Sequence, residues 1–327
     1  MTRYGADRVS LVADVGGTNT RVALAEGLTL LPETVVRFTN AEHAGLESVL
    51  RDYLADCGGV DCAGACVAVA GPVRDGVGEL TNLDWRITNE TLAAATQAET
   101  VSILNDLQAQ GWAIPHLSPE KLHPVLTPPG PVDPRATCLV IGAGTGFNAA
   151  PVYWQGETRL VTPSECGHAG MPVRTEADLR LAKFVESAHG FPGVEDVLSG
   201  RGLERIYAWH SAEQDALQQA RAVEIMAVLA DGRDPLAEAA ARSYVRLFGA
   251  VAGDLALNTL PFGGVYLIGG VATAFRPYYE RFDFASAFRD KGRFAGFMSN
   301  FGVSLVLDDV AALTGCASHL DCLARAR

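Results

Sequence analysis

The sequence predicts an α/β protein with two domains, and this prediction rests on three observations. Apolar, strand-like runs alternate with helix-like segments along the first third of the chain, a pattern typical of strands and helices packed in layers. A strand, a Gly/Thr turn and a second strand occur in succession near residue 14 and again near residue 141. The length of 327 residues also exceeds the roughly 250–300 residues at which single cores stop growing.

The elements of the first third follow from short apolar runs and their periodicity. Apolar residues recur at helical spacing between 43 and 56, which predicts an amphipathic helix. Asn105-Asp106 ends a strand, and a second helix is expected from there to about Ile114. The expected strands are Val9–Val15, Arg21–Ala25, Thr34–Phe38, Ala65–Ala70 and Val101–Leu104.

A proline-rich stretch between residues 115 and 134 is the clearest candidate for a domain boundary, because proline interrupts both helices and strands. The strand and turn pattern restarts after it, which is a weak internal echo of two similar halves. The later strands are expected at Thr137–Ile141, Asn148–Tyr153 and Val265–Ile268, and the later helices at about 175–189, 235–259 and 309–324.

The composition is ordinary for a soluble globular protein and argues against some partners. Apolar residues make up 48% of the chain and charged residues 20%, and the net charge is −12. An acidic chain lacks the basic footprint of proteins that bind nucleic acid or anionic membranes, so neither partner is expected. A nucleotide ligand stays open, because a local loop and a metal ion can bind phosphate on an acidic protein.

The N-terminus and the cysteines favour a cytoplasmic protein. MTRYGADRVS lacks the long apolar core of a signal peptide, and no run approaches membrane-spanning length. The seven cysteines are scattered and odd in number, which suits free thiols in a reducing compartment. Cys62 and Cys66 resemble half of a zinc site, but no second pair with adjacent histidines follows.

The turn DVGGTNTR, which begins at Asp14, has the composition of a phosphate-binding loop. Backbone N–H groups of such a turn can converge on phosphate oxygens, and Gly16 and Gly17 permit a positive φ and close approach. Thr18 adds a hydroxyl beside Asn19. The alternative is a plain hairpin turn between strands. The spacing of a dinucleotide fingerprint is absent, and no Gly-Lys-Ser/Thr of a Walker loop follows.

Two further glycine-rich turns follow strands later in the chain. In IGAGTGFN, Thr145 lies between Gly144 and Gly146. In LIGGV, Gly269 and Gly270 separate a strand from a helix, where an adenosine could lie flat against the backbone. Each turn alone also suits a purely structural role. Three of them in this order favour a nucleotide held between two lobes.

Polar residues in three segments have the chemistry of an acceptor site. Asn105-Asp106 lies where a strand ends and a helix begins, a usual place for ligand-binding groups in α/β folds. In the functional interpretation, Asp106 is a general base that accepts a hydroxyl proton as the oxygen attacks phosphorus. Both residues also suit a helix N-cap. Glu165, His168 and Glu195 complete a set that binds polyhydroxylated ligands, although a solvated surface uses the same residue types.

Taken in order, these segments resemble the bacterial glucokinase family, in the hexokinase branch of the actin-like ATPase superfamily. The resemblance runs from about residue 10 to beyond residue 310. Single pieces are not specific, but the combination is highly specific. The motifs are DVGGTNTR, LTNLDW, LNDL, GAGTG, PSECGH, VEDVLSGRGL, GGVYLIGGV and FRDKGRF.

The resemblance implies two ribonuclease H-like α/β domains that flank a cleft, in which ATP–Mg²⁺ and a hexose meet. It implies a smaller domain of residues 1–112, joined by the C-terminal segment 303–327, and a larger domain of residues 113–302. Asp106 would be the base that acts on the 6-hydroxyl. The sugar contacts would be Asn82, Asn105, Asp106, Glu165, His168 and Glu195.

The resemblance also implies a nucleotide site. The loops at 14–21 and 142–146 would hold the phosphates, and Gly269-Gly270 would line the adenosine pocket. In this superfamily the carboxylate equivalent to Asp14 faces the divalent ion, often through water, and the ion bridges the phosphates. An aspartate inside a phosphate loop is then explained, because it attracts the metal.

Three departures from the family pattern occur near these motifs. Cys166 replaces the small residue that usually follows the glutamate, and Phe147-Asn148 replaces the usual Leu-Gly after GTG. A bulkier turn there could alter the nucleotide fit or the sugar range. Arg201 stands where a proline is common. The double-cysteine zinc motif of the repressor–kinase group of sugar kinases is absent.

The resemblance therefore implies ATP-dependent phosphorylation of glucose at the 6-hydroxyl, with domain closure to exclude water. Lys291 and Arg293 are candidates for contacting the transferred phosphoryl group, although structural roles are favoured. A kinase of another hexose, such as mannose or fructose, stays open, as does a non-catalytic sugar sensor. A plain actin-like ATPase would leave the acceptor residues unexplained. The family is often dimeric, so a homodimer is a weak expectation.

Overall fold

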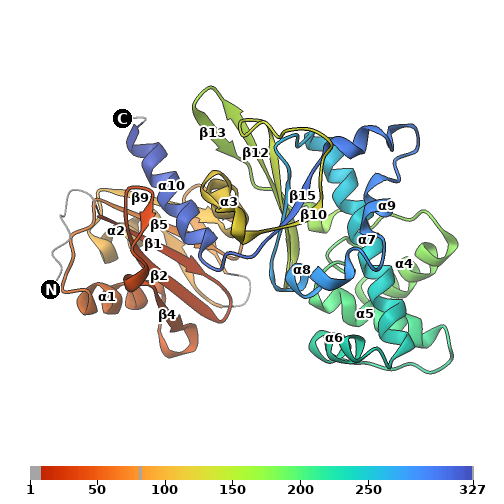
Figure 1. The fold of residues 1–327 in the computed structure, drawn as a ribbon. Coiled ribbons are helices and arrows are strands. Elements are labelled where there is room, and N and C mark those ends of the chain that lie inside the picture. Colours follow the sequence, from red (N-terminus) through yellow and green to blue (C-terminus); the bar gives the residue numbers. More distant parts are fainter. Residues whose placement is uncertain (1–8, 81–82, 326–327) are drawn as a thin grey trace. The chain divides into compact units, whose positions relative to one another are not determined.

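The structure, a computed structural model, describes residues 9–80 and 83–325, which form two compact units (Figure 1). The first unit contains the chain up to Ser118, the segment Gln155–Pro163 and the C-terminal segment from Asp308. The second contains Pro119–Trp154 and Ser164–Leu307. Each unit combines a mixed sheet with helices, which confirms the predicted α/β class.

The sheet of the first unit has the strand order β3-β2-β1-β5-β9, and β4 also pairs with β2. β1 is antiparallel to β2 and parallel to β5, which is parallel to β9. Val69 of β5 lies opposite both Val15 and Asn105, so three parallel strands end at one edge of the sheet. The strands are β1 Val9–Val15, β2 Asn19–Glu26, β3 Thr29–Leu30, β4 Val36–Thr39, β5 Gly64–Val69 and β9 Thr100–Asn105.

Helices cover this sheet, and the apolar face of α1 lies in the core of the unit, where Leu46, Val49 and Leu50 are buried. The C-terminal helix α10 contacts β1, β5 and α3. The helices are α1 Leu46–Asp56, α2 Asn89–Thr96, α3 Asp106–Ala113 and α10 Ala311–Arg325. The remaining strands are β6 Val73–Arg74, β7 Val77–Glu79, β8 Arg86–Thr88 and β13 Thr158–Val161.

The second unit repeats the arrangement of a hairpin next to parallel strands, with the order β10-β15-β14-β11-β12. β11 and β12 form the antiparallel hairpin, and β11, β14 and β15 are parallel to one another. β10 is antiparallel to β15 at the edge. The strands are β10 Leu122–Leu126, β11 Cys138–Ala143, β12 Phe147–Gln155, β14 Val265–Ile268 and β15 Val303–Val306.

The longest helix of the second unit, α7, packs against α5 and α9. Pro235 occupies its first turn, and the side chain of Asp234 caps it by accepting a 2.8 Å hydrogen bond from the backbone N of Leu236. Its buried Tyr244 stacks on Phe275 with ring centroids 4.4 Å apart. The helices are α4 Glu176–His189, α5 Gly200–Ala212, α6 Ala222–Asp231, α7 Pro235–Thr259, α8 Gly270–Ala274 and α9 Phe284–Arg289.

Two expected elements differ in extent from the structure. The strand expected at Thr34–Phe38 is divided into a 3₁₀ turn, Pro32–Thr34, and β4. Thr34 Oγ1 causes this, because it donates to the carbonyl oxygen of Leu31 (2.6 Å) and accepts from the backbone N of Leu24 (2.9 Å). The helix expected from residue 43 begins only after the extended Gly45. The other expected strands and helices end within two residues of their observed bounds.

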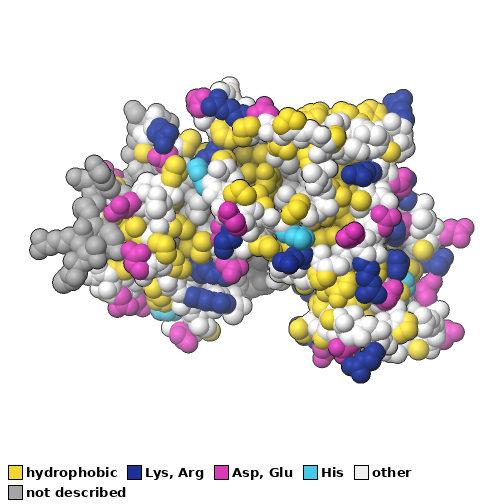
Figure 2. All heavy atoms as spheres, viewed as in Figure 1, with side chains coloured by type: hydrophobic (Ala, Val, Ile, Leu, Met, Phe, Trp, Pro, Cys, Tyr) yellow, Lys and Arg dark blue, Asp and Glu magenta, His cyan; other side chains and the backbone are white. Residues whose placement is uncertain are grey.

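The surface carries mixed charge. On the face shown in Figure 2, acidic and basic side chains are interspersed with apolar ones over both units. In the described part of the chain, no helix is both long enough and apolar enough to cross a bilayer. All seven cysteines are free thiols, as the sequence predicts.

Candidate active site

Two predicted site carboxylates lie at the edge where the parallel strands of the first unit end. Asp14 is the penultimate residue of β1, opposite Ala68 of β5. Asp106 follows the last residue of β9 and is the first residue of α3. Both side chains are half-buried. Asp106 Oδ1 accepts a 2.8 Å hydrogen bond from the backbone N of Leu107, so the first turn of α3 holds the carboxyl group at this edge.

Burial and mutual repulsion perturb both carboxyl groups. Burial, and then the nearby charge of Asp14, raise the pKa of Asp106 to about 7, against the opposing hydrogen bonds from Leu107 and Asn105. Burial also raises the pKa of Asp14, and the charge of Arg21 opposes that shift. A carboxyl group with a pKa near 7 suits a general base at neutral pH.

Asn105 is engaged by the protein through both ends of its amide. Its Oδ1 accepts a 3.0 Å hydrogen bond from the backbone N of Leu107, and its Nδ2 donates to the carbonyl oxygen of Gly71 at 3.0 Å. Its backbone N donates to Gln108 Oε1 at 3.1 Å, which completes a capping box. The N-cap interpretation is therefore confirmed, and a sugar contact through the second Nδ2 hydrogen stays a prediction. Asn82, the other predicted asparagine, lies outside the described residues.

The turn between β1 and β2 is held from the side by Asn40, which the sequence reasoning missed. Gly16 N donates to the carbonyl oxygen of Asn19 (3.0 Å) and closes the turn. Asn40 donates from Nδ2 to the Gly16 carbonyl oxygen (2.8 Å) and from its backbone N to that of Thr18 (2.9 Å). Thr20 Oγ1 donates to Asn40 Oδ1 (2.8 Å). The one sequence signal is an asparagine directly after a strand, which is also an ordinary turn signal.

The expected backbone conformation of this turn is wrong in one respect. Neither Gly16 nor Gly17 adopts a positive φ. A Cβ built on Gly16 would lie 3.4 Å from the carbonyl oxygen of Asn19, which is close to an ordinary contact. The hydrogen bonds from Asn40 give the turn its shape without a left-handed residue. The contact of Gly16, Gly17, Thr18 and Asn19 with phosphate stays a prediction.

On the second unit, the turn between β11 and β12 lies against Glu195. Gly144 N donates to the carbonyl oxygen of Gly146 (2.9 Å), and Thr145 between them is exposed. Glu195 Oε2 accepts a 3.0 Å hydrogen bond from the backbone N of Phe147. A Cβ on Gly146 would lie 2.6 Å from the same oxygen, so a larger residue there would displace the carboxylate.

Two more loops meet the same turn. The carbonyl oxygen of Gly144 accepts a 2.9 Å hydrogen bond from the backbone N of Gly200, at the start of α5. Gly269 has a φ of 100°, and a Cβ there would lie 2.4 Å from the carbonyl oxygen of Ala143. Only glycine fits at this position. Gly270 begins α8 with open space around it. The second and third glycine-rich turns therefore lie together on the second unit.

Glu165 and His168 lie on a loop that packs against this region. Glu195 N donates to the carbonyl oxygen of Gly167 at 2.8 Å, which joins the loop to the segment before α5. Glu165 Oε2 accepts a 2.8 Å hydrogen bond from Asn148 Nδ2. His168 is exposed at the end of the 3₁₀ turn Cys166–His168. The structure thus brings Glu165, His168 and Glu195 onto neighbouring backbone segments.

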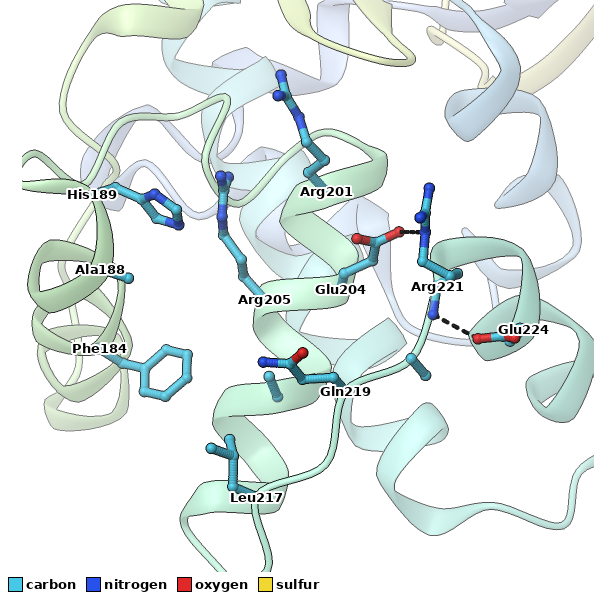
Figure 3. Close-up of a pocket in the computed structure, with 12 residues that line it drawn as sticks. Phe184, Ala188, His189, Arg201, Glu204, Arg205, Leu217, Gln219, Arg221 and Glu224 are labelled. Carbon is cyan, nitrogen blue, oxygen red and sulfur yellow. Dashed lines mark hydrogen bonds and ion pairs between the residues drawn. The ribbon is translucent and has the colours of Figure 1, made fainter.

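The second unit also has a pocket of about 540 Å³ between α4, α5 and the segment before α6 (Figure 3). Arg201 and Arg205 of α5 line the pocket, and Glu204 Oε1 accepts a 3.2 Å hydrogen bond from Arg221 Nε. None of the predicted site residues lines this pocket. Arg201 is mostly exposed, and its guanidinium lies 3.7 Å from Glu195 Oε1, so it approaches a predicted sugar ligand.

Lys291 has a structural position. Its Nζ donates to the carbonyl oxygen of Ala250 (2.8 Å) and to Asp254 Oδ1 (2.7 Å), both on α7. Its side chain is only 8% exposed. The Arg293 guanidinium lies 5.6 Å from the ring centre of Phe294. These contacts support the structural interpretation of both residues.

Two similar α/β units, each with a glycine-rich hairpin turn beside parallel strands, form the actin-like ATPase fold, and sugar kinases are one class built on it. A profile of the family described as Glucokinase matches residues 11–322. The chain belongs to the Glucokinase family.

Known proteins of this family match almost the whole chain. The glucokinase of Saccharophagus degradans (strain 2-40) is 31% identical over 315 residues, which cover 95% of this chain and 98% of that relative. The crystal structure of glucokinase from an Antarctic psychrotroph has a TM-score of 0.85 at 28% identity, covering 96% of this chain and 98% of that one. Glucokinase from Balamuthia mandrillaris, solved in complex with glucose, has a TM-score of 0.79 at 22% identity, covering 95% and 92%, and supports the fold.

Proposed function

We propose that this protein transfers the γ-phosphoryl group of ATP to the 6-hydroxyl of glucose. The position of Asp106 carries the proposal: a half-buried carboxyl group at the start of α3, beside Asp14, with a pKa of about 7. Such a group takes a hydroxyl proton effectively near neutral pH. Membership of the Glucokinase family and the similarity to the glucokinase of Saccharophagus degradans support both the reaction and the choice of sugar.

In the proposed reaction, the 6-hydroxyl oxygen attacks the γ-phosphorus while the Asp106 carboxylate accepts the hydroxyl proton. The bond between the γ-phosphorus and its bridging oxygen to the β-phosphorus breaks, so the products are ADP and glucose 6-phosphate. Backbone N–H groups of the turns at 14–21 and 142–146 bind phosphate oxygens, and Gly269-Gly270 contacts the adenosine. The proposed sugar ligands are Asn82, Asn105, Asp106, Glu165, His168 and Glu195.

Mg²⁺ is the proposed cofactor, and Asp14 is its proposed carboxylate. The donors fit this ion, because Asp14 and Asp106 are near enough for one charge to raise the pKa of the other. Mg²⁺ retains several waters, so one or two carboxylates suffice, and it would neutralise charge on the phosphates. The described residues contain no group of three or more His, Cys, Asp or Glu that could hold a metal, so water and phosphate would supply the other ligands.

We also propose a cytoplasmic location and a homodimer. The seven free thiols support the first, because thiols persist in reducing compartments. The second rests on the family resemblance alone.

Release of ADP tests the proposed reaction. ATP and Mg²⁺ are supplied with glucose, mannose, fructose or no sugar, and kcat/KM is measured for each sugar. Turnover is expected only with a sugar, and kcat/KM is expected to be highest for glucose. A higher value for mannose or fructose would identify a kinase of another hexose. Glucose binding without ADP release would favour a sensor, and release without sugar would show that the acceptor residues are assigned wrongly.

Gly167→Ala is expected to raise the glucose KM by about tenfold or more. A Cβ at this position would lie 1.9 Å from the carbonyl oxygen of Phe147, so the loop with Glu165 and His168 must move. Displacements of about 1 Å in substrate-positioning groups have effects of this size or larger. Gly170→Ala in the same loop is the matched control, because its Cβ would meet only Phe191 at 3.7 Å. Equal KM values for the two variants would contradict the assigned loop.

A further inference from the structure

Asn148, the second residue of β12, connects three parts of the predicted sugar site. Its Nδ2 donates to Glu165 Oε2 at 2.8 Å. Its Oδ1 accepts from the backbone N atoms of Ala149 (3.0 Å) and Cys166 (3.1 Å), and Ser164 Oγ lies 3.2 Å away. The side chain is half-buried in the second unit, so these contacts are partly shielded from water.

These contacts fix which way the amide points. Two backbone N–H groups, from Ala149 and Cys166, face one end of the Asn148 side chain, and an N–H group can be satisfied only by the amide oxygen. The NH₂ end must therefore face Glu165. An ionised carboxylate can only accept hydrogen bonds, and the NH₂ end of Asn148 can only donate them. Donor and acceptor therefore match at both ends of the amide.

Phe147, which precedes Asn148, donates a hydrogen bond to the second carboxylate, that of Glu195. The backbone N of Phe147 donates to Glu195 Oε2 at 3.0 Å, and Asn148 Nδ2 donates to Glu165 Oε2 at 2.8 Å. Consecutive residues of β12 thus each hold one oxygen of one carboxylate. The Oε1 atom of Glu165 is not engaged by these donors and can accept a hydrogen bond from a sugar hydroxyl, whereas Glu195 Oε1 lies 3.7 Å from the Arg201 guanidinium.

We propose that Asn148 is a positioning residue for sugar binding: it fixes the rotamer of Glu165, so that Oε1 is presented to a sugar hydroxyl. The inference rests on the proposed function, in which Glu165 is one of the residues that bind the sugar. Asn148 itself does not touch the reacting atoms, and phosphoryl transfer depends on Asp106 on the first unit. A defect at Asn148 therefore acts on glucose affinity and leaves the chemical step unchanged.

Asn148→Asp tests this with the smallest change in shape. The variant keeps an oxygen for the N–H groups of Ala149 and Cys166, but it places a second carboxylate against Glu165 in place of the donor. The glucose KM is expected to rise about ten- to hundredfold, the size of losing a hydrogen bond to a charged group. The KM for ATP and kcat are expected to stay within about threefold.

The pH dependence of this variant separates positioning from a general structural defect. Two facing carboxylates raise each other's pKa and share a proton at lower pH, which restores a hydrogen bond between residue 148 and Glu165. The ratio of the variant's glucose KM to that of the wild type is therefore expected to shrink as pH falls from about 8 to about 6. A purely structural defect has no reason to recover in that direction.

Two further variants complete the experiment. Asn148→Gly removes every side-chain contact and is expected to show a raised glucose KM at all pH values. Asn258→Asp, on an exposed position of α7, adds the same charge elsewhere on the unit and is expected to match the wild type. Thermal melting of all proteins establishes that each is folded.

A wild-type glucose KM in Asn148→Asp, or a loss confined to kcat, overturns the inference. A raised KM that does not respond to pH and occurs with a lowered Tm also overturns it, because the residue would then be merely structural. Failure of the wild type to phosphorylate glucose refutes the proposed function instead. In that case, glucose affinities from titration calorimetry without ATP still show whether Asn148 supports sugar binding.

Discussion

Asp106→Asn is expected to lower kcat by about a hundredfold or more and to leave glucose affinity within about threefold. The amide keeps the size of the carboxyl group and keeps an oxygen for the backbone N of Leu107, which lies 2.8 Å from Asp106 Oδ1. It cannot accept the hydroxyl proton, and loss of a general base typically has an effect of 10²–10⁴. Steady-state kinetics and calorimetry measure the two quantities. Asp56→Asn, at the exposed end of α1, is the matched control with unchanged kinetics.

Asp106→Asn is expected to lower activity but to raise the free energy of unfolding, and the gain in stability depends on pH. Burial and Asp14 raise the pKa of Asp106 from 3.8 to about 7, so folding favours its protonated form. The stability that this preference contributes is complete below pH 3.8 and is lost as pH rises through about 7. The neutral amide avoids that loss. In metal-free buffer without nucleotide, Asp106→Asn is therefore expected to be about 1–3 kcal/mol more stable than the wild type above pH 7, with little difference near pH 4.

An inactive variant that is more stable than the wild type is the expected signature of a strained functional carboxyl group. Urea denaturation at several pH values measures the difference. If Asp106→Asn loses stability at high pH, the carboxylate is favourably bound in the folded state, and its assignment as a destabilised base is incorrect.

Gly315→Ala is expected to lower the free energy of unfolding by about 3 kcal/mol and to reduce kcat strongly. A Cβ on Gly315 of α10 would lie 1.7 Å from the carbonyl oxygen of Ala109 on α3, so the two helices must separate. Overpacking of a core costs about 1–3 kcal/mol and sometimes more, which exceeds the gain of about 1 kcal/mol in helix propensity. Since α3 begins at Asp106, the shift also moves the proposed base.

Thr314→Ala is the matched control for this prediction, because it lies on the same helix and adds no atom toward α3. The urea midpoint and kcat are compared for the two variants and the wild type. A wild-type midpoint for Gly315→Ala would mean that α10 and α3 do not approach each other as closely as the structure shows.

The strands and glycine turns could be predicted because their signals are local. β14 ends where its apolar run meets Gly269, and α7 begins at Pro235 and ends at Thr259, as its periodicity predicts. The edge position of Asp14 and Asp106 could also be anticipated, since Asp14 lies near the end of one apolar strand, Asp106 directly follows another, and parallel strands end together. Several such motifs, taken in order, resemble the Glucokinase family, and that resemblance implied the actin-like fold.

Side-chain support between distant segments could not be predicted from the sequence. Asn40 holds the turn at Gly16 from 24 positions away, and Asn148 holds Glu165 from 17 positions away. Neither spacing corresponds to a helical or strand period, so no pattern marks these residues. Gly16 and Gly17 were also expected to adopt a positive φ. Neither does, and hydrogen bonds from Asn40 hold the turn instead.

The reason for several glycines is likewise a long-range one. Gly146 leaves room for the Glu195 carboxylate, and Gly167 leaves room for the backbone of Phe147. Composition can mark such positions as turns, but the neighbouring atom that excludes a side chain comes from a remote part of the chain.

The proposed reaction moves a phosphoryl group from ATP to the 6-hydroxyl of glucose. The most direct measurement is a phosphorus–proton correlation NMR spectrum of the product formed from ATP, Mg²⁺ and glucose by the wild type and by Asp106→Asn at equal concentration. A phosphorus signal coupled to the two protons on carbon 6, formed rapidly by the wild type and at least about a hundredfold more slowly by Asp106→Asn, is the predicted result. Coupling to the anomeric proton, or formation of ADP and inorganic phosphate without any sugar phosphate, would contradict it.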